Sequence, residues 1–376
     1  MKIVNLDGVT TNPGDLSWDG MKKLGDFTVY DRTSPDQIIE RAKGANALII
    51  NKTILTKEIL EQLKPELEYV GLQSTGYNVV DCESAKKLGI TVCNIPSYST
   101  NAVAQLVFSF ILQFTNKVSL HSEAVHNGEW CSCPDFCFWK APLAELAGKT
   151  IGIIGFGAIG QKVAKLAEAF DMNVLAYAPR PKDKGELKTV KFVTLDELLK
   201  ESDIITCHCP LTNETKGMIN EETITKMKKS AIFINTSRGP VVDEKALANA
   251  LNNEMIQGAG LDVLSVEPAD KDNPLLNAKN CYITPHIAWA AKETRERLLG
   301  ILEDNLKAYI DGHAFFEACY IKSLICPLML MQKIPFDIYI KRYFFIQLFI
   351  IFFAADFTFR MVNQLFDVFS MCQNNY

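Results

Sequence analysis

Residues 150–178 read TIGIIGFGAIGQKVAKLAEAFDMNVLAYA, and this segment carries the strongest evidence in the sequence for one type of fold. The run 151–154 is short, apolar and rich in β-branched residues, which is typical of a strand buried on both faces. A helical pattern follows over 159–170, and a second apolar run over 173–177 predicts another strand. A strand, a helix and a strand at this spacing form the βαβ unit of a parallel sheet.

Three glycines in the pattern G-x-G-x-x-G lie where the first strand must turn into the helix. Gly155 permits the tight turn, Gly157 lets a pyrophosphate approach the backbone, and Gly160 allows close packing of helix on strand. The first N–H groups of the helix, those around Ala158 and Ile159, face that pyrophosphate at the positive end of the helix dipole. The sequence therefore predicts a Rossmann domain that binds a dinucleotide.

The residue at the end of the second strand leaves the choice of dinucleotide open. An acidic residue about 20 positions past the glycines would accept hydrogen bonds from the ribose hydroxyls and favour NAD. That place holds Ala178, and Arg180 follows two residues later. A guanidinium there pairs with a 2′-phosphate if it faces the ribose, and is a solvated loop arginine if it does not. The sequence thus predicts NAD or NADP.

Composition and charge indicate a two-domain protein of the cytoplasm. The chain has 376 residues, a net charge of −5 and a pI near 5.7, so it lacks the basic excess expected of a nucleic-acid-binding protein. No secretory signal follows Met1, and the 11 cysteines are odd in number, which favours reduced thiols. Cys131, Cys133 and Cys137 lie near His126, but their spacing matches no standard zinc site, and we predict no metal.

The first hundred residues alternate strand-like and helix-like segments, which predicts a parallel α/β sheet. The expected strands are 2–6, 27–30, 47–50, 69–72 and 91–94, and the expected helices are 34–43, 57–63 and 82–88.

Helices at 100–113 and 119–127 lead into the second α/β unit. Its further strands are expected at 204–209, 231–235, 258–262 and 281–284, and its helices at 195–200, 220–227 and 244–252. A last helix over 292–311 closes the fold. The expected fold class is α/β, with two doubly wound parallel-sheet domains: residues 1–100 plus 291–313, and residues 101–290.

Residues 314–376 differ sharply from the rest of the chain. They hold 12 of the 22 Phe and none of the 21 Gly. The run 343–359 is 17 residues long, at the short limit for a membrane span, and contains Gln347 and Asp356. Three interpretations stay open: a translated frameshift or read-through product, a tail that contacts a membrane, and a packed extension. We expect the fold to be complete without this segment.

Three side chains near the ends of the later strands suit hydride exchange between a nicotinamide and a 2-oxo acid. Arg238 follows the strand 231–235 and offers a forked cation to the substrate carboxylate and carbonyl. His286 follows the strand 281–284, and its ordinary pKa suits it to supply a proton to the carbonyl oxygen. Glu267 would stabilise the protonated imidazole and orient it. Each residue alone has a structural explanation, but together, after a dinucleotide turn, they predict a catalytic site.

The chain resembles the D-isomer-specific 2-hydroxyacid dehydrogenases over roughly residues 1–313. The resemblance is carried by GIIGFGAIG at 152–160, HCPLTNET at 208–215, INTSRG at 234–239, GLDVLSVEP at 260–268 and ITPHIAWA at 283–290. STGYN at 74–78 and PDFCFW at 134–139 are most similar to the glycerate dehydrogenase (hydroxypyruvate reductase) branch.

That resemblance implies a flavodoxin-like substrate domain and a Rossmann domain with a cleft between them, a homodimer, and the three catalytic roles given above. It implies that the substrate is bound by Ser74, Thr75, Gly76, Arg238 and His286. It implies a cofactor site formed by Gly155, Gly157, Ala158, Ile159, Gly160, Ala178, Arg180, Pro210, Thr215, Thr236, Ser237, Arg238, Asp262, His286, Ala288 and Trp289.

The chain departs from the family in lacking the acid usual at Ala178 and in its long ending. Two alternatives to a cytoplasmic 2-oxo acid reductase remain at this point: a corepressor-like relative that senses NAD(H), and a dehydrogenase tethered to a membrane by its tail.

Overall fold

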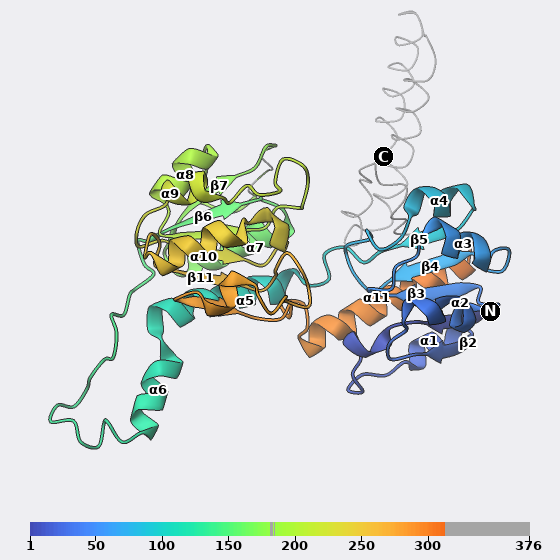
Figure 1. Ribbon diagram of the computed structural model, residues 1–376, viewed down its shortest axis with the longest axis horizontal. Coiled ribbons are helices and arrows are strands. Elements are labelled where there is room, and N and C mark those ends of the chain that lie inside the picture. Colours follow the sequence, from blue (N-terminus) through green and yellow to red (C-terminus); the bar gives the residue numbers. More distant parts are fainter. Residues whose placement is uncertain (181–182, 184, 313–376) are drawn as a thin grey trace, which may run out of the picture. The chain divides into compact units, whose positions relative to one another are not determined.

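The computed structural model describes residues 1–180, 183 and 185–312 (Figure 1). These residues all belong to one compact unit of the chain. The expectations for residues 314–376 lie outside the described residues.

The first sheet has five parallel strands in the order β2-β1-β3-β4-β5. The strands are β1 (Lys2–Asn5), β2 (Asp26–Val29), β3 (Ala47–Ile50), β4 (Tyr69–Leu72) and β5 (Thr91–Cys93). The chain runs outward from β1 on one side and returns to β3 on the other, so the order reverses between β1 and β3. This is the flavodoxin-like arrangement, which binds ligands at the carboxyl ends of the strands beside that reversal.

Helices cover both faces of the first sheet because its strands are apolar on both sides. On one face lie α2 (Ile38–Ala42), α3 (Lys57–Leu63) and α4 (Cys82–Lys87), packed on a cluster that includes Leu48 and Ile50 of β3. On the other face lie α1 (Asp19–Leu24) and α11 (Lys292–Ile310), packed on a cluster that includes Ala47 and Ile49. The last described helix therefore returns to the first sheet.

The second sheet has seven parallel strands in the order β12-β11-β10-β9-β6-β7-β8. They are β6 (Thr150–Ile154), β7 (Asn173–Tyr177), β8 (Val190–Phe192), β9 (Ile204–Cys207), β10 (Ile232–Asn235), β11 (Gly258–Leu261) and β12 (Cys281–Ile283). Six of these strands follow the Rossmann order around β6, with β12 added at one edge. The predicted fold class, two doubly wound parallel-sheet domains, is confirmed.

The second sheet is also covered on both faces (Figure 1). The helices α5 (Thr100–Asn116) and α7 (Ala158–Ala169) pack on one apolar cluster. The helices α8 (Leu195–Glu201), α9 (Glu221–Thr225) and α10 (Glu244–Asn252) pack on the other. A further helix, α6 (Val118–His126), and the loop after it extend away from this sheet (Figure 1).

Among the described α-helices and strands, two short elements were not expected from the sequence: α1, in which only Met21 is buried, and the three-residue strand β8. The helix expected over 34–43 is divided into a 3₁₀ turn, Pro35–Gln37, and the helix α2. Proline fits the first turn of a helix, where its missing N–H is not needed. β9 ends at Cys207, two residues earlier than expected, and several other boundaries differ by one to three residues.

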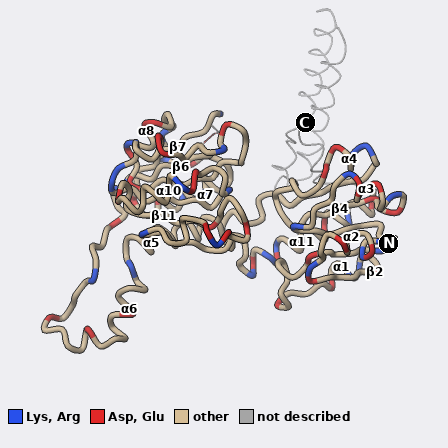
Figure 2. Tube along the Cα trace, viewed as in Figure 1, with Lys and Arg blue, Asp and Glu red and all other residues tan. Residues whose placement is uncertain are grey.

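Within the described residues, no single helix is long and apolar enough to cross a membrane. The helices α5 and α6 meet those criteria only as a pair bent by 54°, and eight side chains of α5 are buried. Basic and acidic residues are interspersed along the described chain (Figure 2).

Candidate active site

A histidine and a glutamate form the centre of the candidate site. His286 Nδ1 lies 2.7 Å from Glu267 Oε2, and both side chains are about one-third exposed. Burial alone would raise the pKa of Glu267, but its hydrogen bond with His286 and the charge of His286 outweigh burial and lower it. The carboxylate is therefore ionised at neutral pH and only accepts, so Nδ1–H donates to it. Within the described part of the chain, the ring makes no other hydrogen bond, which leaves Nε2 available to a ligand.

The loop that carries His286 is held by a buried carboxylate. Asp262, which follows β11, accepts hydrogen bonds from the Thr284 hydroxyl at 2.6 Å and from the N–H groups of Ile287 and Ala288 at 2.8 and 2.9 Å. Only 1% of Asp262 is exposed. Burial raises the pKa of this carboxyl, although its three donors oppose the rise. These hydrogen bonds fix the loop in a conformation in which His286 has φ 55°. This is the left-handed region, which few residues other than glycine adopt.

A second buried side chain shapes the turn that carries Arg238. Asn235, at the end of β10, accepts hydrogen bonds from the N–H and hydroxyl of Ser237 and donates to the Arg238 carbonyl at 3.0 Å. Gly239 follows, and a Cβ there would lie 1.9 Å from the backbone of Leu264. A side chain at that position would force the Arg238 turn away from the segment that leads to Glu267. The Arg238 side chain itself is exposed.

The loop after β4 brings free N–H donors to Arg238. A Cβ added to Gly76 would lie 3.3 Å from Arg238 Nη2. The loop is fixed by the Thr75 hydroxyl, which donates to the Ile95 carbonyl, and by the Ser74 hydroxyl, which donates to the Gly76 carbonyl. In the part of the chain that the structure describes, the backbone N–H groups of residues 74–76 donate to no protein acceptor. They suit a carboxylate beside Arg238.

The glycine turn fits the pyrophosphate of a dinucleotide. Gly155 has φ 95°, and a Cβ there would lie 2.6 Å from the Cys209 backbone nitrogen. A Cβ on Gly160 would lie 2.3 Å from the Gly155 carbonyl oxygen, so only glycine permits this packing. A Cβ on Gly157 meets no atom of the described residues within 4 Å, which leaves space at the N-terminus of α7. Among the described residues no side chain caps that terminus, so its N–H groups are available to an anion.

The other residues expected at the cofactor differ in their surroundings. Thr236 is buried, and among the described residues its hydroxyl has no hydrogen-bond partner. Thr215 donates to the Pro210 carbonyl and so closes the loop between them. Ala178 packs partly against the cluster under α5 and α7, and Arg180 is exposed. In the loop after β12, Ala288 is buried, and Trp289 packs against the cluster beneath the first sheet.

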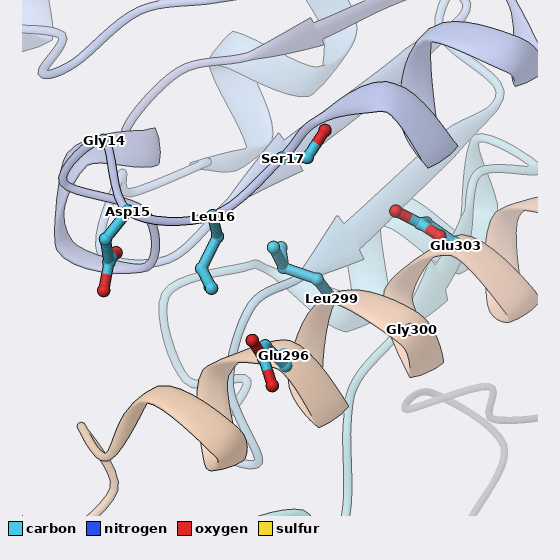
Figure 3. Close-up of a pocket in the computed structure, with 8 residues that line it drawn as sticks. All are labelled: Gly14, Asp15, Leu16, Ser17, Glu296, Leu299, Gly300 and Glu303. Carbon is cyan, nitrogen blue, oxygen red and sulfur yellow. The ribbon is translucent and has the colours of Figure 1, made fainter.

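A cavity of about 540 Å³ lies apart from these residues, between the segment Gly14–Ser17 and α11 (Figure 3). Its acidic side chains are Asp15, Glu296 and Glu303, and Asp15 is paired with Arg295. It contains none of the residues expected at the site. Its size is therefore no guide to where the chemistry lies.

Sequence reasoning did not identify three residues that shape the site: Asn235, Asp262 as the anchor of the His286 loop, and Tyr98. Tyr98 is buried; burial raises the pKa of its phenol, and the charge of Arg238 opposes the rise. For Asn235 and Asp262 a signal was present, because a polar residue at the end of an apolar strand needs a partner. For Tyr98 we find no signal in the sequence.

The chain matches known proteins over both sheets. Residues 108–288 match the family described as D-isomer specific 2-hydroxyacid dehydrogenase, NAD binding domain. The chain is 49% identical over 315 residues to a hydroxypyruvate reductase of Blautia hydrogenotrophica, which covers 83% of this chain and 98% of that protein. It is 41% identical over 290 residues to a glycerate dehydrogenase of Methylorubrum extorquens, which covers 76% and 90%.

Among solved structures, an acyclic imino acid reductase in complex with NADPH and D-Arg superimposes with a TM-score of 0.73 and 33% identity. The superposition covers 84% of this chain and 99% of that one. The chain therefore belongs to the D-isomer specific 2-hydroxyacid dehydrogenases, enzymes that reduce 2-oxo acids to D-2-hydroxy acids with NADH or NADPH.

Proposed function

We propose that this enzyme reduces a small 2-oxo acid of the hydroxypyruvate or glyoxylate kind, with His286 as the proton donor. The observation that carries the proposal is the 2.7 Å hydrogen bond between His286 Nδ1 and Glu267, which leaves Nε2 for the substrate. The similarity to a hydroxypyruvate reductase and a glycerate dehydrogenase supports this substrate class.

In the proposed mechanism, NADH or NADPH held at the turn of Gly155, Gly157 and Gly160 would supply the hydride that reduces the carbonyl carbon. Arg238 and the free N–H groups of residues 74–76 bind the substrate carboxylate and so orient the carbonyl. The protonated His286 gives its Nε2 proton to the carbonyl oxygen as negative charge develops there. Glu267 keeps the imidazole in one orientation and stabilises its charge. In the oxidation direction His286 takes the proton back.

A panel of 2-oxo acids tests the substrate class. Hydroxypyruvate, glyoxylate, pyruvate and 4-methyl-2-oxopentanoate would each be assayed with NADH and with NADPH. We expect the highest kcat/KM for hydroxypyruvate or glyoxylate. A preference for the branched substrate would show that the pocket takes alkyl groups, and the proposed substrate class would be wrong.

The pH dependence tests the role of Glu267. Because its pKa is lowered, Glu267 is charged wherever His286 is protonated in the neutral range. In Glu267→Gln the protonated imidazole loses this neighbour and persists only at lower pH, so the upper pH limit of reduction should move towards acid. The measurement is kcat/KM against pH. Glu40→Gln, at an exposed position on α2, is the control. An unchanged profile in Glu267→Gln would contradict the assigned role.

The proposed cofactor site extends over the residues expected from the sequence, and its preference depends on the end of β7. Ala178 has no carboxylate to repel a 2′-phosphate, and Arg180 is exposed nearby. We therefore expect wild type to use both cofactors or to lean towards NADPH. Ala178→Asp should shift the ratio of kcat/KM values towards NADH. A wild-type preference for NADH above about tenfold, or about 1.4 kcal/mol, would show that Arg180 is a solvated arginine that does not bind the 2′-phosphate.

We further propose a homodimer located in the cytoplasm. The loop after α6 supports the homodimer, because it exposes two large apolar side chains: Phe136 is 89% exposed and Trp139 is 68% exposed. Apolar side chains of a dimer interface are exposed in this way when one subunit is considered alone. Sedimentation equilibrium measures the oligomeric state. For the domain limits we keep 1–100 plus 291–313 and 101–290, which is supported by the packing of α11 on the first sheet and of α5 on the second.

A further inference from the structure

The loop that follows α6 is closed at its base by its own residues. Lys140 Nζ lies 2.6 Å from Glu129 Oε2, so the two ends of the segment 130–139 are held together. We call this segment the arm loop; it extends away from the second sheet (Figure 1). Beyond it, the Ala144 N–H donates to the Thr115 carbonyl at 3.1 Å and so returns the chain to α5.

His121, on α6, uses both of its ring nitrogens at the base of the arm loop. Nδ1 lies 2.9 Å from the carbonyl oxygen of Lys117, at the turn between α5 and α6. The backbone N–H of Lys140 donates to Nε2 at 3.1 Å. A carbonyl oxygen only accepts and a backbone N–H only donates, so Nδ1 carries the proton of the ring and Nε2 carries none. This pair of hydrogen bonds requires the neutral imidazole.

A second proton on His121 is incompatible with the contact to Lys140. It would place an Nε2–H group against the Lys140 N–H, and two donors cannot bond to each other. The bond to the Lys117 carbonyl would remain, because Nδ1 donates in both charge states. Protonation therefore breaks the link to the arm loop and leaves the link to the turn before α6.

The charged groups around His121 do not replace that link. In the part of the chain that the structure describes, no carboxylate forms an ion pair with this ring. The pair between Lys140 and Glu129 is about two-fifths exposed on each side, so it adds little to the closure of the base. The charged or titratable groups of the elements in contact are Lys117 on the turn, Glu123 and His126 on α6, and Glu129 and Lys140 on the loop.

We propose that His121 is a pH-sensitive latch of the arm loop: the neutral imidazole holds the base closed, and the protonated imidazole releases Lys140. Imidazole side chains change their charge between about pH 5 and 8. Because the closed base requires the neutral ring, it is favoured at the upper end of this range and is lost as the pH falls.

The latch has a consequence for association that rests on the proposed homodimer. The arm loop carries Trp130, Phe136 and Trp139, which are 52%, 89% and 68% exposed. A closed base restricts the positions of these side chains before two subunits meet, whereas a released loop must be ordered during association. The dimer should therefore be weaker at acid pH.

Hydrogen exchange of the full chain at pH 7.5 and 5.5, each corrected for the intrinsic exchange rate, tests the latch. In wild type the protection of the Lys140 amide should fall about tenfold or more at pH 5.5, because its acceptor is lost. His121→Gln offers an acceptor that does not titrate and should retain protection at both pH values. His121→Lys, with a charge and no acceptor, should lack it at both. Peptides of α5 are the internal reference and should not change.

Two control variants separate the imidazole from its neighbours. His126→Gln replaces the exposed histidine at the end of α6, and Glu129→Gln removes the charge paired with Lys140. Both should retain the pH dependence of wild type. Equal protection of the Lys140 amide at the two pH values in wild type, a pH dependence that persists in His121→Gln, or its loss in Glu129→Gln would each overturn the latch.

Sedimentation equilibrium at the same two pH values tests the consequence for association. The Kd of the wild-type dimer should rise about tenfold or more at pH 5.5, and that of His121→Gln should not. A wild-type chain that is monomeric at pH 7.5 would show that the homodimer proposal is wrong, while the exchange data would still decide the latch. A dimer with equal Kd at both pH values would overturn the link between the latch and association.

Discussion

Replacement of His286 by alanine is expected to lower kcat for 2-oxo acid reduction by about 10²- to 10⁴-fold, the usual contribution of a positioned general acid. Among the described residues, His286 Nε2 has no hydrogen-bond partner, and the partner of Nδ1, Glu267, is ionised and has no proton to give. Cofactor affinity should change little, because the pyrophosphate site lies at the glycine turn after β6. Steady-state kinetics and a fluorescence titration with NADH and NADPH measure the two effects.

The matched control is His126→Ala, since His126 is exposed at the end of α6. It should leave kcat unchanged. His286→Ala with wild-type kcat would remove His286 from the mechanism. A large loss of cofactor affinity in the same variant would instead indicate that the loop after β12 had moved, because Asp262 holds that loop by its neighbours Ile287 and Ala288.

Gly155→Ala should destabilise the fold, whereas Gly157→Ala should not. At Gly155 the backbone has φ 95°, and the added methyl would lie 2.6 Å from the Cys209 nitrogen and 2.7 Å from the His208 backbone. The strained backbone alone costs about 1–2 kcal/mol, and the overlap adds to it. A melting temperature lower by at least about 3 °C is expected.

At Gly157 the same methyl meets no atom of the described residues within 4 Å, and φ is −80°. We expect an unchanged melting temperature, because nothing in the protein must shift. The methyl would instead occupy the space where the pyrophosphate approaches, and the Kd for the dinucleotide should rise about tenfold, or about 1.4 kcal/mol. Calorimetry and titration of both variants separate stability from binding. If Gly157→Ala bound the cofactor as wild type does, the pyrophosphate would not lie on this turn.

Long apolar runs made most of the fold predictable. Strands such as β3 and β10 are apolar on both faces, and the glycine turn after β6 has a strong local signal. The elements that were missed have no such signal. The helix α1 is six residues long and buries only Met21, and β8 is an edge strand with one buried residue. Their formation depends on the sheets they join rather than on their own sequence.

The candidate site was predictable only in part, because some of its contacts depend on how the strands are arranged in the sheets. The positions of Arg238 and His286 just after strands follow from the strand pattern, and the bond between His286 and Glu267 agrees with the expected pairing. The anchoring role of Asp262 depends on which strands are neighbours, and that is decided by packing across the whole sheet. A motif in the sequence does not contain this information.

Asp7 and Asp262 hold neighbouring loops in the same way. In each sheet an aspartate after one strand holds the loop after the adjacent parallel strand: Asp7, after β1, holds residues 51–53, after β3, and Asp262, after β11, holds residues 284–288, after β12. Each loop loses its conformational freedom when its own sheet folds, not when ligands arrive. The amide protons bonded to these aspartates should therefore exchange slowly with solvent even in the free enzyme, and substrate binding incurs little entropic cost for ordering either loop.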